Sequence, residues 1–122
     1  MDAAVTLRLT PEMLATAYEF LRVSAPFRAW KFPDADEVEF HVIRARDRRG
    51  HYCQGEGAPH RIAVSAANVG HTETLIRTVA HEMIHLYQRE RRSDTTNAEH
   101  NAEFLRLARL VCLHHGFDPR AF

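Results

Sequence analysis

The stretch from Thr72 to Arg89 constrains the fold more than any other part of this 122-residue chain. It contains no glycine and no proline, so nothing in it interrupts a helix. Its apolar residues recur at the three- and four-residue spacing that forms one face of an α-helix; they are Ile76, Val79, Ala80, Met83 and Tyr87. We therefore predict a long amphipathic helix that packs against a core through this face.

The same helix carries the motif His-Glu-x-x-His, formed by His81, Glu82 and His85. Residues four apart lie on one face of a helix, so the two imidazoles can bind one metal ion. Glu82 can reach a water on that metal. Two imidazoles and an adjacent carboxylate are used in zinc-dependent peptide hydrolysis. A step of about 100° per residue puts both histidines on a polar stripe opposite the apolar face, together with Thr74, Arg77, Thr78 and Gln88. The alternative is a solvated helix face that contains two histidines by chance.

A catalytic zinc ion needs a third protein ligand and leaves its fourth position to water. The pattern in which a third histidine follows the second by six residues is excluded, because that position is Arg91. A carboxylate from a downstream helix can also complete such a site, so acidic residues must be weighed. The candidate third ligands are Glu90, Glu99, His100 and Glu103.

A second helix is predicted from Ala98 to His115, with Asn97 as its N-cap and Gly116 in the left-handed position past its end. His100 then falls on the apolar stripe of this helix, one turn before Phe104, and points toward the first helix. A histidine there is more often a hydrogen-bonded core residue than a ligand. Because the zinc site is otherwise incomplete, we prefer His100 as the third ligand, with Glu99 and Glu103 as competitors.

Upstream of the motif, the pattern predicts one helix and three short strands. Pro11 after Thr10 opens a helix that runs to about Val23. The strands are predicted over residues 37–45, 51–54 and 61–66. We expect an α+β fold with an N-terminal helix, a small three-stranded antiparallel sheet in a meander, and two further helices. Residues 62–65 are predicted to run near the cleft, where many zinc peptidases hold an extended substrate.

These segments resemble a known protein family. The segment Thr78-Val79-Ala80-His81-Glu82-Met83-Ile84-His85, followed by His100-Asn101-Ala102-Glu103-Phe104, resembles the SprT-like domain of the SprT/Spartan metalloproteases. Asn101 departs from the glycine that this family usually has there. The helix before Trp30, then Gly50-His51-Tyr52 and Ile62-Ala63-Val64-Ser65, resemble the helix and small sheet upstream. The resemblance covers roughly residues 10–118, with specific motifs only in the last third.

The resemblance implies zinc ligands at His81, His85 and His100, with Glu82 as general base. It implies a zinc-dependent endopeptidase, whose substrates in several members are proteins crosslinked to DNA. Members often carry a C-terminal zinc ribbon of four cysteines, whereas this chain has only Cys53 and Cys112. We therefore expect residues 1–122 to form a single SprT-like metalloprotease domain without a ribbon, acting on unfolded or DNA-associated proteins.

The charge and composition of the chain limit which partners it can bind and in which compartment it works. A formal net charge of zero argues against strong nucleic-acid binding. The chain has no apolar run long enough to span a membrane, no organised signal peptide and no disulfide framework, which favours the cytoplasm. Of its 16 basic residues only Lys31 is a lysine, and arginine suits phosphate contacts. A DNA contact, which we rank below solvated turns, would use Arg44, Arg46, Arg48, Arg49, Arg89, Arg91 and Arg92.

Two other functions fit the same residues. One is a cytoplasmic His-Glu-x-x-His protease that cleaves one specific repressor or partner. The other is a non-catalytic, zinc-stabilised binding module, although an open three-ligand site has no structural advantage over a closed one. A peptidase also needs a donor to the oxyanion. Arg77 or a residue of the 94–97 loop is a candidate, whereas Tyr87 lies on the apolar side of its helix.

Overall fold

A computed structural model of the chain describes residues 6–95 and 97–122. Residues 1–5, within the segment judged for a signal peptide, and Thr96, in the loop considered for the oxyanion, lie outside the described residues. The elements are α1 (Pro11–Arg22), two single turns of 3-10 helix (Phe27–Trp30 and Ala35–Glu37), β1 (Val38–Ile43), β2 (Gly50–Cys53), β3 (His60–Ser65), α2 (Thr72–Arg91) and α3 (Ala102–His115).

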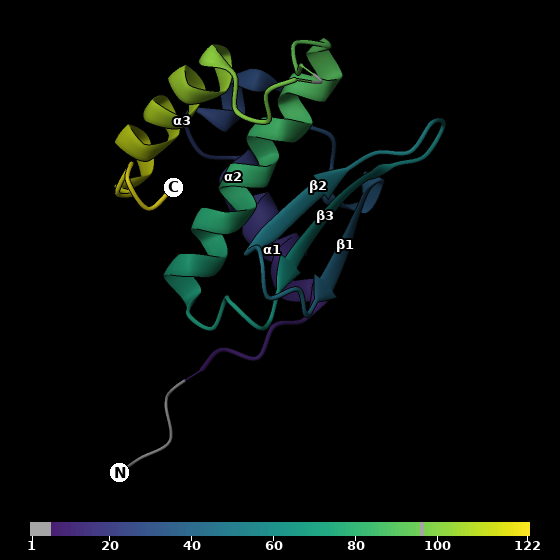
Figure 1. The fold of residues 1–122 in the computed structure, drawn as a ribbon, viewed down its shortest axis with the longest axis vertical. Coiled ribbons are helices and arrows are strands. Elements are labelled where there is room, and N and C mark those ends of the chain that lie inside the picture. Colours follow the sequence, from purple (N-terminus) through teal and green to yellow (C-terminus); the bar gives the residue numbers. More distant parts are fainter. Residues whose placement is uncertain (1–5, 96) are drawn as a thin grey trace.

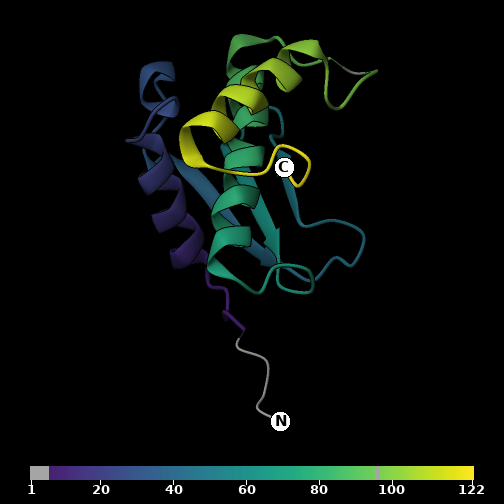
Figure 2. The same ribbon diagram turned by 90° about the vertical axis from the view of Figure 1, so that its left-hand side faces the viewer.

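The helices form layers around the sheet. α1 and α2 cover one face of the sheet, and α3 packs on the side of α2 that faces away from it (Figures 1 and 2). α2 is therefore central, between the strands and α3. Its buried side chains include Leu75, Val79, Met83 and Leu86. The α+β class is confirmed.

The sheet is mixed, so the predicted antiparallel meander is wrong. The strand order is β1-β3-β2. β1 runs parallel to β3, with Val38 opposite His60, and β2 runs antiparallel to β3, with Gly50 opposite Val64. Alternation along a strand fixes which side chains share a face, but it does not say which strands pair. β3 is buried at five of its six positions and takes the centre, because a strand covered on both faces is best placed between two others.

This order moves the free edge of the sheet. β3 is hydrogen-bonded on both sides, so residues 62–65 have no main-chain groups left for a substrate. β2 is instead an edge strand, and it lies beside α2 (Figure 1). The expectation that residues 62–65 hold substrate is therefore corrected.

The start of α1 agrees with the local sequence pattern, whereas the start of α3 does not. α1 begins as predicted, with the Thr10 side chain accepting a hydrogen bond from the Met13 amide. α3, however, begins at Ala102, four residues later than predicted, and its N-cap is Asn101. The Asn101 side chain caps the Phe104 amide at 2.9 Å and donates to the Ser93 carbonyl at 3.0 Å. Contacts to α2 and its end thus select Asn101 over Asn97.

Two further expectations can be compared with the structure. Cys53 and Cys112 are both free, in keeping with the absence of a disulfide framework, and Cys112 is buried in the core. Tyr87 stacks on Trp30, with ring centroids 4.8 Å apart, on the apolar side of α2. Across the described residues, no helix has the length and apolar character needed to cross a membrane.

Candidate metal centre

α2 and the loop before α3 bring three histidines together. His81 and His85 lie one turn apart on α2, and His100 faces them from the loop. One ring nitrogen of each lies within 4.8 Å of the other two. The Nε2 atoms of His81 and His100 are 3.1 Å apart, close to the roughly 3.3 Å between two nitrogens on one tetrahedral zinc ion. The three imidazoles therefore fit a zinc ion as a donor set.

His100 reaches this position for a reason other than the predicted one. It precedes α3 rather than lying on its apolar stripe, because the helix starts at Ala102. The ring is stacked on Phe104, with centroids 4.3 Å apart, and this contact turns it toward His81 and His85. His100 thus lies beside His81 and His85, whereas its predicted place on the apolar stripe of the helix is wrong.

The competing carboxylates are placed differently. Glu90 is hydrogen-bonded to His60, and Glu103 accepts a hydrogen bond from the Gln88 side chain at 2.9 Å. Glu99 is the carboxylate near the cluster, with an oxygen 3.7 Å from His100 Nε2, although its side chain is 83% exposed. Among the described residues, Glu99 is therefore the alternative third ligand that geometry leaves open.

Burial keeps the two helix histidines neutral. Burial, together with the charge of the neighbouring histidines, lowers the pKa of His81 to about 4 and that of His85 to about 3. A metal ion binds the neutral imidazole. At neutral pH these two side chains are therefore already in the form that binds a metal ion.

Glu82 is the buried acid of the site. The residue is only 6% exposed and lies between two cavities, of about 490 and 180 Å³. Burial and, to a smaller extent, the charge of Glu99 raise the pKa of its carboxyl to about 8, although Arg48 opposes this shift. A carboxyl that exchanges its proton near neutral pH suits general acid–base chemistry.

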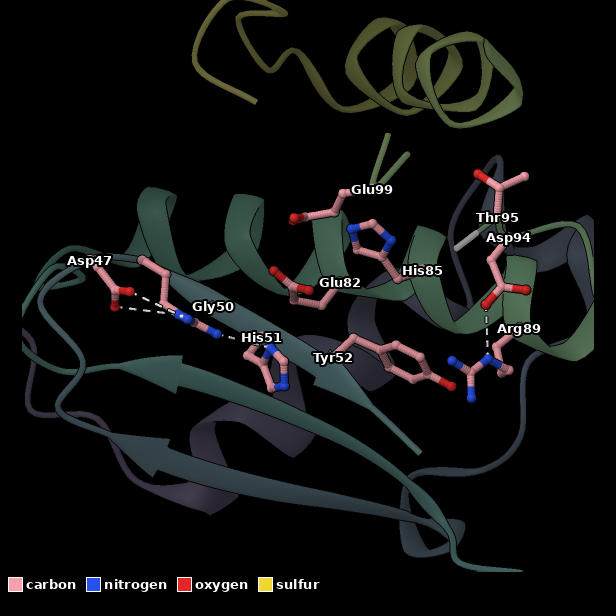
Figure 3. Close-up of a pocket in the computed structure, with 11 residues that line it drawn as sticks. Asp47, Gly50, His51, Tyr52, Glu82, His85, Arg89, Asp94, Thr95 and Glu99 are labelled. Carbon is pink, nitrogen blue, oxygen red and sulfur yellow. Dashed lines mark hydrogen bonds and ion pairs between the residues drawn. The ribbon is translucent and has the colours of Figure 1, made fainter. Parts of the chain in front are cut away.

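The larger cavity is a cleft between β2 and α2. Figure 3 shows Glu82 and His85 facing it from α2, with Asp47 and Arg89 at its opposite ends. Of the polar stripe of α2, His85 borders this cleft, while Arg77, Thr78 and His81 border the smaller cavity. Parts of the stripe are buried, since Gln88 is held by Asn101 and Glu103. The remaining residues that line the cleft are Arg48, Gly50, His51, Tyr52, Asp94, Thr95 and Glu99.

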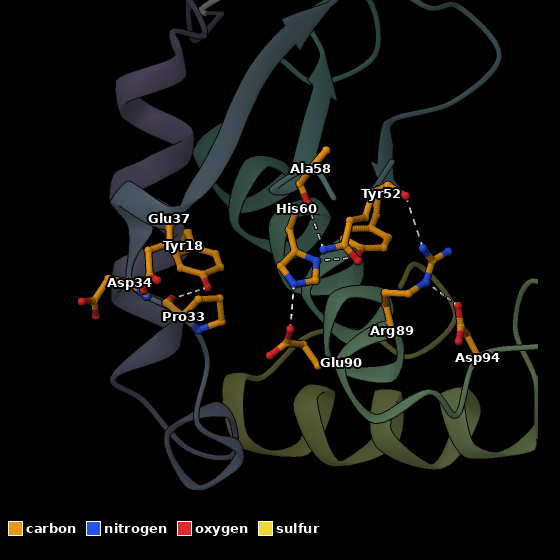
Figure 4. A network of polar contacts seen from close by, with 11 residues as sticks. Tyr18, Pro33, Asp34, Glu37, Tyr52, Ala58, His60, Arg89, Glu90 and Asp94 are labelled. Atoms are coloured by element: carbon orange, nitrogen blue, oxygen red, sulfur yellow. Dashed lines mark hydrogen bonds and ion pairs between the residues drawn. The ribbon is translucent and has the colours of Figure 1, made fainter. Parts of the chain in front are cut away.

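One end of the cleft is fixed by a polar network. The Tyr52 hydroxyl lies 2.6 Å from His60 Nδ1, and His60 Nε2 lies 2.9 Å from Glu90 (Figure 4). Arg89 donates to Asp94 at 2.9 Å (Figure 4). These contacts tie β2 and β3 to the last turns of α2. They also engage Arg89, which sequence analysis considered for phosphate contact.

The predicted oxyanion donors and the other arginines can now be located. Arg77 borders the smaller cavity, but it donates to both carboxylate oxygens of Glu73 at 2.6 Å. Arg91 lies over the Tyr87 ring, 5.1 Å from its centroid. In the described ranges 6–95 and 97–122, no ion pair involves Arg44, Arg46, Arg49 or Arg92.

Sequence analysis missed the role of Gly50. A Cβ at this position would lie 2.7 Å from Thr78 Cγ2, 3.0 Å from Glu82 Oε2 and 3.1 Å from the Ala63 carbonyl oxygen. Gly50 therefore lets α2 approach β2 closely enough to hold Glu82 against the sheet. Its signal was ambiguous, because a glycine before a strand also fits an ordinary turn.

We expect Gly50→Ala to disturb the site and the core together. The added methyl must displace Thr78, Glu82 or the main chain of β3, at a cost of about 1–3 kcal/mol in the free energy of unfolding. Gly55→Ala is the matched control, since a Cβ there has its nearest contact at 3.6 Å. Denaturant unfolding of both variants measures the difference. Equal stabilities would show that α2 does not depend on the close approach at Gly50.

A second prediction concerns the metal-free protein. In the folded, metal-free state Glu82 keeps its proton up to about pH 8, whereas an unfolded glutamate loses it above about pH 4.5. The positive charge of a bound zinc ion would favour the ionised carboxylate, so this prediction applies to the metal-free protein alone. Folding therefore binds a proton between these values, and the stability of the wild type falls as pH rises through them. Glu82→Gln removes this penalty, so at pH 7 it should stabilise the metal-free protein by on the order of 3 kcal/mol.

The pH dependence separates this effect from other consequences of the substitution. The difference in unfolding free energy between Glu82→Gln and wild type should vanish near pH 4.5 and grow up to about pH 8. Glu56→Gln, at an exposed turn position, is the control. A Glu82→Gln variant that is less stable than wild type at pH 7 would contradict the buried, proton-retaining carboxyl.

A comparison with protein-family models gives a match. The sequence model of the SprT-like family matches residues 20–120 of the chain. The match includes the helix with His81 and His85 and the loop with His100. A comparison with curated proteins gives no match.

Proposed function

The chain belongs to the SprT-like family, and from this premise we propose that it is a zinc-dependent endopeptidase. The family is usually a zinc metallopeptidase-like domain. The observation that carries the proposal is the convergence of three imidazoles beside a buried carboxyl in an open cleft. We also propose that residues 1–122 act as one catalytic domain and that it works in the cytoplasm, where its free cysteines stay reduced.

The roles of the residues follow from their placement. His81, His85 and His100 would hold the zinc ion. When bound, zinc polarises the scissile carbonyl and lowers the pKa of its water toward about 7. Glu82 accepts the proton of the attacking water and passes it to the amine of the leaving product. Its buried position excludes competing solvent, which strengthens its interaction with the reacting groups.

The unpaired edge of β2 is an argument for a substrate that binds in extended form. Within the described part of the chain no strand pairs with β2 on the side away from β3, and β2 borders the cleft together with Glu82 and His85. A peptide can add to such an edge through main-chain hydrogen bonds, as in other cases of strand addition. A segment already paired within a folded domain cannot, so we propose unfolded or locally unfolded proteins as substrates.

An arginine-rich loop is an argument for substrates that are associated with DNA. Arg46, Arg48 and Arg49 border a shallow cavity with Asn68, beside the Asp47 end of the cleft. Arg48 is paired with Asp47, while Arg46 and Arg49 have no ion pair among the described residues. Free guanidinium groups next to the cleft could hold phosphates while a neighbouring protein is cut.

Cleavage of one protein in its unfolded and folded forms tests the proposal. We expect the zinc-loaded chain to cut the unfolded form, a chelator to abolish cleavage and zinc to restore it. A parallel reaction with single-stranded DNA tests the arginine loop, and we expect the DNA to stimulate cleavage. The double variant Arg46→Ala/Arg49→Ala should lose this stimulation and keep the rate of cleavage without DNA. If neither form is cut under any condition, the general endopeptidase fails. Cleavage of one partner only, indifferent to DNA, would favour the repressor-specific protease.

A further inference from the structure

The end of the chain returns to the metal centre. After α3, residues 117–122 fold back toward α2 (Figures 1 and 2). The main-chain oxygen of Phe122 lies 2.8 Å from Nδ1 of His81, which is 41 positions earlier in the chain. Neither the helical pattern nor the His-Glu-x-x-His motif predicts this contact, because it depends on how the last segment packs.

The contact determines where His81 carries its hydrogen. A main-chain oxygen has no hydrogen and can only accept, so Nδ1 of the neutral ring must be the donor. Nε2 is then left with a free lone pair. This atom is the one that faces the cluster, 3.1 Å from His100 Nε2. The hydrogen bond to Phe122 therefore presents the correct nitrogen of His81 to a metal ion.

The segment is fixed by contacts of its own. The Phe122 ring packs on the His81 ring, with centroids 5.3 Å apart, and stacks on Phe117 at 5.9 Å. Phe117 is buried and its amide bonds to the Cys112 carbonyl at the end of α3. The Ala121 amide closes a turn onto Asp118. Both ends of the segment are thus attached, one to α3 and one to the ligand ring.

The same residues form part of the wall around Glu82. Ala121 and Phe122 border the smaller cavity, which Gly50, Thr78 and Glu82 also line. The segment therefore limits solvent on the side of Glu82 away from the main cleft. The segment thus links α3 to the His81 ring and borders the cavity that Glu82 lines.

We propose that Phe122 is a positioning residue of the metal centre, whose main-chain oxygen holds His81 in the Nδ1–H form and fixes its ring orientation. The proposal rests on the proposed function in one respect, that His81 is a metal ligand. Ligand histidines generally donate their second ring N–H to such an acceptor, and loss of the acceptor weakens metal binding roughly 10–100-fold. The buried Phe117, bonded to the end of α3, anchors the segment that carries this acceptor.

Two measurements test the proposal without relying on peptidase activity. The first determines the tautomer of His81 in the metal-free, full chain from long-range ¹H–¹⁵N correlations of ¹⁵N-labelled imidazoles. We expect the Nδ1–H form. A neutral ring in the Nε2–H form cannot donate from Nδ1 to Phe122, so that form would overturn the proposal.

The second measurement compares zinc affinities by competition with a chelator. A chain that ends at Arg120 lacks the acceptor, and we expect its zinc dissociation constant to rise roughly 10–100-fold. Phe122→Leu keeps the main-chain oxygen and an apolar side chain, and it should bind zinc nearly as the wild type does. Arg120→Ala is the matched control in the same segment, since its side chain is 93% exposed.

Each outcome is decisive. Wild-type zinc affinity in the shortened chain, with an unchanged circular dichroism spectrum, would overturn the proposal. If the shortened chain fails to fold, the tautomer in the full chain decides. A protein that has the Nδ1–H form and binds zinc through His81 but cuts no substrate would refute the endopeptidase and leave this inference standing.

Discussion

Zinc-loaded Glu82→Gln should bind the metal as the wild type does and cleave an unfolded protein about 10²–10⁴-fold more slowly. Glutamine matches the shape of the side chain but cannot accept the proton of the attacking water. Glu82 is not part of the three-imidazole cluster, so the donor set for the metal is untouched. Single-turnover cleavage at saturating enzyme measures the chemical step directly.

The control for this experiment is Glu99→Gln. Glu99 borders the same cleft but is exposed, so its loss should change cleavage far less than the loss of Glu82. Bound zinc is measured in every sample, so that a lost metal is not mistaken for a lost base. A Glu82→Gln variant that cleaves at the wild-type rate would assign proton transfer to another group.

His100→Ala should lose zinc during dialysis, while the wild type keeps it. Removing a ligand should cost more than the roughly 10–100-fold in affinity that loss of a supporting acceptor costs. Two imidazoles remain, and both come from one helix, so nothing then links the metal to the loop before α3. Metal content after dialysis and competition with a chelator measure the effect.

His51→Ala is the matched control for His100. His51 borders the same cleft from β2, but it lies outside the three-histidine cluster and faces Arg48. It should keep zinc at full stoichiometry. Full stoichiometry in His100→Ala as well would move the third ligand to Glu99, the neighbouring carboxylate, and the double variant with Glu99→Gln would then lose the metal.

Local patterns were sufficient for the elements but not for their arrangement. Proline and threonine at the start of α1 and the uninterrupted period of α2 predicted both helices well. The start of α3 depended on a choice between Asn97 and Asn101, which have the same capping chemistry. Asn101 is selected by its bonds to Ser93 and Gln88. The pairing of β1 with β3 likewise depends on contacts across the chain, which alternation within each strand cannot encode.

The same division applies to the site. The spacing of His81, Glu82 and His85 placed three side chains on one helix, because helical geometry is regular. His100 was chosen because the zinc chemistry needed one more ligand, and the structure puts it beside the other two by a different local route. Phe104, whose ring contacts all three imidazoles and is 2% exposed, was predicted only as part of an apolar stripe.

Positions that support the site from far along the chain carried no signal. Gly50 acts through the space it leaves for Thr78 and Glu82, and Phe122 acts through a main-chain atom that every residue has. Neither effect depends on a side-chain chemistry that a motif can record. Such positions become visible only when the packing of distant segments is known.

The free edge of β2 also bears on self-association. Exposed strand edges tend to pair with one another and lead to aggregation, which proteins limit by keeping them short or covering them. β2 has only four residues and its free edge opens into the cleft beside α2. The edge of another copy's sheet would have to enter that cleft with its whole domain attached. A single extended peptide has no folded domain attached and can enter the cleft. The cleft therefore protects the main-chain groups of β2 from pairing with another copy while leaving them open to a substrate.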